Sequence, residues 1–110
     1  DRRWTPKWDG FNVPVSELGD DWTTRFHIWE LDWTQSQMRI LLDGRVLNTV
    51  NLNETVNGSA QCAGQNPFKQ PHYILLNLAL GGAGGSVEQL QFPTRYLVDY
   101  VRVYKTDGGQ

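Results

Sequence analysis

This sequence has a single cysteine, nearly balanced charge and no long apolar run. Its single cysteine, Cys62, cannot form an internal disulfide or a cysteine-based metal site, and is interpreted as a small apolar residue of a loop. Its 10 Lys and Arg against 12 Asp and Glu give a net charge of -2, which excludes a polybasic nucleic-acid-binding protein. No apolar run approaches the roughly 20 residues of a membrane-spanning helix. Neither a nucleic acid nor a membrane is therefore expected as a partner.

Aromatic residues are what the sequence has in unusual number. Five Trp, four Tyr and four Phe make up 12% of the chain, and four of the five Trp lie within the first 29 residues. Aromatic residues at this density are typical either of a β-rich core or of a surface that stacks on flat ligands. Composition alone does not separate these two possibilities.

The first three predicted strands lie close together in the sequence. Residues 24–33 are aromatic and β-branched, and as a strand they would place His27, Trp29 and Leu31 on one face. Residues 37–42 and 45–50 flank Asp43-Gly44, the strongest two-residue signal for a hairpin with a type I′ turn. We therefore expect an antiparallel hairpin over residues 37–50.

Two further strands are predicted near the C-terminus. Residues 72–80 are almost continuously apolar and predict a strand buried on both faces, with Asn77 as its polar member. Residues 96–105 show a mixed alternation that predicts a last strand. No segment predicts a helix longer than one turn. The fold class is therefore all-β, with about five strands.

The remaining sequence is predicted to form loops within a single unit of residues 1–110. Residues 1–21 and 51–71 are rich in turn-forming residues and have no sustained period, so both are expected to be long loops. The predicted strands occupy residues 22–105, and residues 106–110 form a tail.

Four polar residues within the predicted strands are candidates for chemistry. His27 and Asn77 interrupt apolar or aromatic segments and need hydrogen-bond partners if they are buried. With Trp29 they match a saccharide site, where a sugar stacks on a ring and its hydroxyls meet donors and acceptors, but a structural role explains them equally well. Glu30 and Asp32 point to one strand face, as a glycosidase pair would, or form a strand end whose acids reach solvent or a nearby Arg.

Three ordered motifs resemble one enzyme family. Phe26-His-Ile-Trp-Glu-Leu-Asp-Trp33, followed by Leu42-Asp-Gly44, resembles the FHxY…W…DG signature of glycoside hydrolase family 16. Residues 71–82 and 98–104 resemble its two later signatures in the same order. The resemblance implies a two-sheet β jelly-roll sandwich with a concave cleft, in the group of β-glucanases, laminarinases, agarases and carrageenases. It also implies a secreted, periplasmic or cell-surface protein.

The sequence departs from the family at the catalytic motif. The E-x-D-x-x-E motif, which carries the nucleophile and the acid/base, is absent, and Glu30-Leu-Asp32-Trp-Thr-Gln35 is a near miss on the strand after the catalytic one. We therefore interpret the chain as the C-terminal half of a family 16 domain and assign it no catalytic residue. The intact domain would perform retaining endo-hydrolysis of a β-linked glucan or galactan. The alternatives are a noncatalytic carbohydrate-binding β-sandwich and an inert fragment.

Five strands offer at most one sheet and part of another, too few to cover both inner faces of a sandwich. Unpaired strand edges would also remain. We therefore expect self-association or pairing with the missing N-terminal half.

The resemblance also implies roles for individual residues. His27, Trp29 and Asn77 would line the cleft for a polysaccharide or oligosaccharide, with Trp29 where relatives carry a sugar-contacting Tyr. Ala79 would leave a neighbouring subsite open. Asp99 would be a ligand of a structural Ca²⁺ in the intact domain, with no cofactor required for catalysis. Three loop residues are further sugar-binding candidates that could equally well close the core: Trp4, Trp8 and Trp22.

Overall fold

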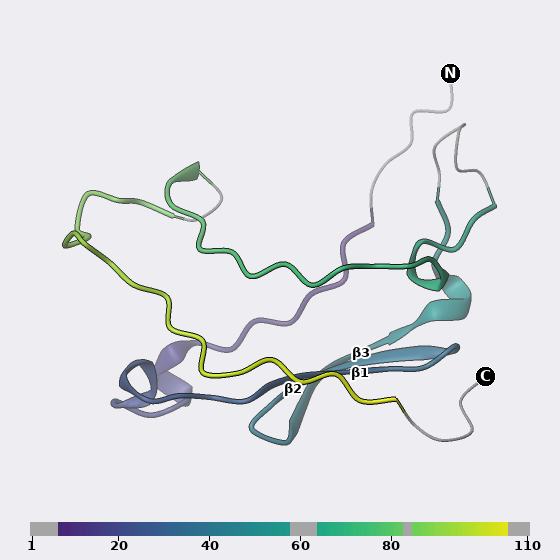
Figure 1. Ribbon diagram of the computed structural model, residues 1–110, viewed down its shortest axis with the longest axis horizontal. Coiled ribbons are helices and arrows are strands. Elements are labelled where there is room, and N and C mark those ends of the chain that lie inside the picture. Colours follow the sequence, from purple (N-terminus) through teal and green to yellow (C-terminus); the bar gives the residue numbers. More distant parts are fainter. Residues whose placement is uncertain (1–6, 58–63, 83–84, 106–110) are drawn as a thin grey trace. The chain divides into compact units, whose positions relative to one another are not determined.

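A three-stranded antiparallel sheet in the order β1-β2-β3 is the main element of the fold (Figure 1). The computed structural model describes residues 7–57, 64–82 and 85–105. The chain divides into two units, Asp1–Pro71, which holds the sheet, and His72–Gly109. None of the helices in the described residues is long and apolar enough to cross a membrane.

The sheet is a meander of β1 (Trp29–Trp33), β2 (Gln37–Leu42) and β3 (Arg45–Asn51). Asp43 and Gly44 join β2 to β3, with φ angles of 49° and 81°. Positive φ at both positions is what a type I′ turn requires, and its twist matches that of the flanking strands. The predicted hairpin is therefore confirmed.

The first predicted strand begins later than expected. β1 starts at Trp29, and the three residues Trp22–Thr24 form a 3₁₀ helix, η2. Trp29 pairs with Leu42, the last residue of β2 before the turn, so residues before Trp29 have no strand beside them. The prediction of a strand over residues 24–33 is thus wrong for its first half.

Three more 3₁₀ helices occur in the described part of the first unit, and each has three residues. They are η1 (Val15–Glu17), η3 (Leu52–Glu54) and η4 (Pro67–Lys69). The side chains of Asn51 and Asn66 cap η3 and η4, because each accepts a hydrogen bond from a backbone N–H in the first turn. As predicted, the described residues hold no helix longer than one turn.

The core is small and is centred on the middle strand. Leu41 and Leu42 of β2 are buried, and Leu52 of η3 is fully buried. One sheet face remains apolar and exposed, since Trp29 and Leu31 of β1 are 60% and 53% exposed. The sheet therefore has more apolar surface than the described residues of the first unit cover.

The described residues of the second unit form no strand, although two were predicted there. Residues 72–80 and 96–105 are exposed along their whole described length, including Leu75 and Val103. A strand exists only when a neighbour satisfies its backbone groups, and neither segment has a ladder partner in the part of the chain that the structure describes. The predicted doubly buried strand and the predicted last strand are therefore not seen here, and the described residues form three strands rather than about five.

Candidate functional site

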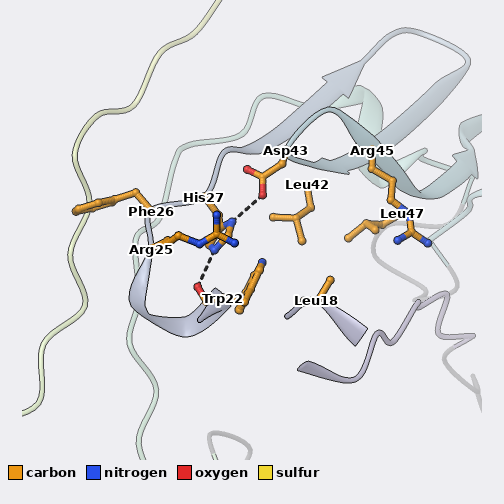
Figure 2. A pocket seen from close by; sticks show the side chains of 9 residues that line it. All are labelled: Leu18, Trp22, Arg25, Phe26, His27, Leu42, Asp43, Arg45 and Leu47. Atoms are coloured by element: carbon orange, nitrogen blue, oxygen red, sulfur yellow. Dashed lines mark hydrogen bonds and ion pairs between the residues drawn. The ribbon is translucent and has the colours of Figure 1, made fainter. Parts of the chain in front are cut away.

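The first unit holds a half-open pocket of about 380 Å³ at the end of the sheet where the β2–β3 turn lies. Figure 2 shows Trp22 and His27 facing each other on one side, and Leu42 and Leu47 on the other. The lining residues come from the segment around η1 and η2 and from the hairpin. They are Leu18, Trp22, Arg25, Phe26, His27, Leu42, Asp43, Arg45 and Leu47.

His27 lies largely buried in the pocket, with 10% of its side chain exposed. Its Nδ1 lies 2.6 Å from Oδ2 of Asp43, and its Nε2 lies 2.7 Å from the backbone oxygen of Trp22. Its ring also stacks on the Trp22 indole, with ring centroids 4.4 Å apart and planes 20° apart. Both ring nitrogens and one ring face are therefore engaged within the chain.

Asp43 is positioned by the hairpin turn. Its backbone N–H donates to the Ile28 oxygen at 2.8 Å, and its Oδ1 accepts from the Ile28 N–H at 2.8 Å. Asp43 thus uses both its backbone and its side chain to join the turn to the segment that precedes β1. The second carboxylate oxygen is left to meet His27.

The pairing of His27 with Asp43 stabilises both charged forms. The Asp43 carboxylate, followed by the Trp22 carbonyl, raises the pKa of His27 above its ordinary 6.5, although burial and the Arg25 charge oppose this. The Ile28 N–H, followed by His27, holds the pKa of Asp43 below its ordinary 3.8. The structure therefore favours protonated His27 and ionised Asp43, which form an ion pair at the pocket.

The rest of the pocket combines apolar walls with positive charge. Leu18, Leu42 and Leu47 supply the apolar contacts, and two guanidinium groups line the edges. Arg25 is also paired with Asp21, at 3.2 Å between Nε and Oδ2. An indole, apolar walls and a few polar groups are the combination that binds a small organic ring such as a sugar.

Of the sequence-predicted site residues, the structure brings together Trp22 and His27. Trp29 lies on β1 and does not line the pocket. His27 lies outside β1, so the strand alternation that predicted a face shared with Trp29 does not apply. Trp8 is 89% exposed and does not line the pocket either, and Trp4 lies outside the described residues, as does Cys62.

Two predicted site residues belong to the second unit. Asn77 and Asp99 are both exposed there, as is Ala79. Within the described residues no three His, Cys, Asp or Glu side chains form a group that could hold a metal ion. The structure therefore supplies Asp99 with no set of side-chain co-ligands, and the calcium site stays a prediction.

The near-miss carboxylates lie on the sheet face opposite Trp29. Asp32 is the cross-strand partner of Arg39, whose Nε donates to Oδ2 of Asp32 at 2.9 Å. A second guanidinium nitrogen, Nη2, donates to the same oxygen. Of the two alternatives left open for Glu30 and Asp32, the structure favours the ion pair with a nearby Arg for Asp32.

Sequence reasoning missed Asp43, which it treated only as a turn residue, and both arginines of the pocket. A usable signal existed for Asp43. In an antiparallel meander whose β1 pairs with β2 up to the turn, the first turn residue lies opposite the residue before β1. Asp43 therefore lies beside Ile28, within reach of the neighbouring His27.

The profile of glycosyl hydrolases family 16 matches residues 13–102. The chain belongs to this family. The chain is similar to "Beta-glucanase" of Rhodothermus marinus, 34% identical over 85 residues, with 74% of this chain and 29% of the relative covered. "Beta-1,3-glucan-binding protein" of Penaeus monodon is 34% identical over 86 residues, covering 68% and 22%. "Keratan-sulfate endo-1,4-beta-galactosidase" of Sphingobacterium multivorum is 34% identical over 85 residues, covering 76% and 19%.

The chain spans less than a third of the length of each of these relatives. No solved structure matches it. The family assignment thus rests on sequence similarity over most of the chain. The candidate site rests on the geometry of the first unit.

Proposed function

We propose that this chain is the saccharide-contacting C-terminal half of a family 16 glycoside hydrolase domain. In this proposal the whole protein performs retaining endo-hydrolysis of a β-linked glucan or galactan. The observation that carries it is the family match over residues 13–102, which includes every residue of the pocket. Relatives named for a glucanase and for a galactosidase support both polymer classes.

In this proposal the catalytic carboxylates come from outside the chain. Retaining hydrolysis needs two carboxyl groups about 5–5.5 Å apart, one as nucleophile and one as acid/base. Asp32 accepts two hydrogen bonds from Arg39, so its carboxylate is already neutralised by an ion pair. The chain contributes binding surface instead, with the Trp22 indole and the pocket around it.

The apolar surface supports the proposal that another protein part completes the domain. Trp29, Leu31 and Ile40 lie on one face of the sheet, and each is exposed. We propose that the N-terminal half of the domain, or a second copy of the chain, covers this face and completes a two-sheet jelly roll. In that assembly Asp99 contributes one ligand to a structural Ca²⁺.

A polymeric substrate places the whole protein outside the cytoplasm in this proposal, as a secreted, periplasmic or cell-surface enzyme. The localisation follows from the size of the polysaccharide.

A noncatalytic carbohydrate-binding module is the second candidate. One observation favours it, namely that one of the relatives is named for glucan binding. An inert fragment would bind no saccharide at all.

Reducing-sugar release distinguishes these candidates. We expect no release from β-glucan or galactan by the chain alone, and release when a separately produced N-terminal half is added. The same mixture without this chain is the control. Saccharide binding without any release in the mixture would favour the binding module. Turnover by the chain alone that Glu30→Gln abolishes would overturn the proposal and assign catalysis to Glu30.

A further inference from the structure

The hydrogen bonds of His27 fix its protonation state by a count of donors. Nδ1 faces a carboxylate oxygen of Asp43, and Nε2 faces the backbone oxygen of Trp22. A carboxylate and a carbonyl can only accept, so both ring nitrogens must donate. A neutral imidazole has one N–H, and the imidazolium has two. The observed geometry is therefore that of protonated His27.

Loss of the proton leaves one of the two contacts with facing lone pairs. The bond to Asp43 is charge-assisted on the acceptor side and is the stronger of the two, so the remaining N–H stays at Nδ1. The Nε2 lone pair would then face the Trp22 oxygen at 2.7 Å without a hydrogen between them. That repulsion favours separation of η2 from the His27 ring.

The charged groups around His27 come from both sides of the pocket. The hairpin contributes Asp43 and Arg45, and the segment around η2 contributes Arg25 with its partner Asp21. The segment after η1 contributes Leu18, which carries no charge. Among the described residues, Asp43 is the carboxylate in direct contact with the ring, and its effect on the His27 charge opposes that of Arg25.

We propose that protonated His27 is a latch that holds Trp22 against the β2–β3 turn, and that the latch opens when His27 loses its proton. The latch is the set Trp22, His27 and Asp43. Because Trp22 forms one side of the pocket, opening removes that side. The latch itself goes beyond the proposed function, whereas its effect on saccharide binding rests on that function.

The direction of the pH response follows from the pKa of His27. A pKa raised by the folded state stabilises the latch fully below the ordinary value of 6.5. That stabilisation is lost as the pH rises through the raised pKa. The latch is therefore closed under mildly acidic conditions and opens toward alkaline pH.

An NMR titration of the full chain tests the latch directly. We expect the His27 imidazole to titrate with a midpoint above 6.5, and the Trp22 indole N–H signal to move with the same midpoint. The sequence has one other histidine, His72, so His72→Gln assigns the imidazole signals. Trp22→Phe assigns the indole signal among the five.

Asp43→Asn is the decisive variant, because its amide oxygen can still accept from the Ile28 N–H while the charge is gone. We expect the His27 midpoint to fall. Asp20→Asn changes the net charge equally at an exposed residue and should leave the midpoint unchanged. If Asp43→Asn fails to fold by circular dichroism, the titration of the unaltered chain decides alone.

A His27 midpoint at or below 6.5 would overturn the latch, and so would an indole signal that does not follow it. Saccharide affinity, measured across the same titration, should fall as His27 loses its proton. If His27 and the Trp22 indole titrate together as expected but no saccharide binds at any pH, the proposed function is contradicted and the latch is not.

Discussion

At the scale of single residues, one carboxylate organises the pocket. Asp43 uses its backbone N–H and both side-chain oxygens to join the hairpin turn to Ile28 and His27. His27 in turn contacts Trp22 by its ring face and by its Nε2. The positions of these three side chains thus depend on one another. A substitution of any one of them should therefore affect the other two.

Asp43→Ala should lower the melting temperature in a pH-dependent way. The Asp43 contribution is present above its ordinary pKa of 3.8 and is lost as the pH falls through its lowered folded value. The His27 contribution is lost as the pH rises through its raised folded value. The difference between the two proteins should therefore be largest between pH 3.8 and 6.5. Thermal unfolding over a pH series checks this, and a difference that is constant with pH would contradict it.

Trp22→Ala should weaken saccharide binding. By analogy with the stacking of aromatic side chains on bases, the loss of one stacked ring costs about 1–3 kcal/mol, or roughly 5- to 150-fold in affinity. Trp8→Ala makes the same chemical change at a residue outside the pocket and should have a smaller effect. Calorimetric titration with β-glucan and galactan oligosaccharides measures both. Equal losses of saccharide affinity in the two variants would show that the pocket is not the binding site.

The roles predicted for Trp29 and Asn77 are tested in the assembled domain. If they line the cleft, Trp29→Ala and Asn77→Ala should each lower oligosaccharide affinity there. Unchanged affinity with a lowered melting temperature would instead assign both residues to the core.

At the scale of elements, the hairpin is the part whose conformation is most locally determined. Asp43 and Gly44 adopt positive φ, and a Cβ at Gly44 would meet nothing within 4 Å. A substitution at Gly44 therefore changes the backbone energy of the turn without a steric clash. This separates conformational strain from packing.

Gly44→Ala should destabilise the chain by about 1–2 kcal/mol, because a residue with a Cβ is disfavoured in the left-handed region. Gly10→Ala is the matched control, since Gly10 has no positive φ in the left-handed range and also has open space around it. It should change the stability little. Urea denaturation followed by circular dichroism measures both, and equal effects would show that the turn is not under conformational constraint.

Leu52→Ala should be among the most destabilising changes to the core of the sheet. The side chain is fully buried, and removal of a buried Leu typically costs about 2–5 kcal/mol. Leu31→Ala, at a side chain that is 53% exposed, should cost much less in the isolated chain. Denaturation curves of the two variants test this order, and a reversed order would contradict the assigned core.

At the scale of the whole molecule, the uncovered sheet face and the exposed second unit share one physical cause. Apolar surface is stabilised only when another surface removes it from water. Trp29 and Leu31 stay exposed on their face of the sheet, and the described parts of residues 72–105 form no strand. Both features favour binding to another protein part that would cover these apolar surfaces.

Leu31→Asp should weaken assembly, either with a second copy or with the N-terminal half, because it places a charge on the apolar face. Glu30→Ala alters the opposite face of the same strand and should leave assembly intact. Sedimentation velocity of the chain, alone and mixed with the N-terminal half, measures both effects. Assembly that is unaffected by Leu31→Asp would show that this face is not the interface.

The sequence by itself determined the features that depend on neighbouring residues. The hairpin over residues 37–50 followed from Asp43-Gly44, since a two-residue turn with positive φ is specified locally. The family followed from three ordered motifs, confirmed by the match over residues 13–102. No partner segment was needed for either inference.

Only the tertiary structure decided where strands begin and which polar groups meet. Residues 24–28 were strand-like in composition, but the partner strand ends at Leu42, so β1 begins at Trp29. The apolar sequence of residues 72–80 forms no strand because a ladder needs a neighbour. The His27–Asp43 contact joins residues 16 positions apart, and its geometry exists only once the β1–β2 register has placed the turn beside Ile28.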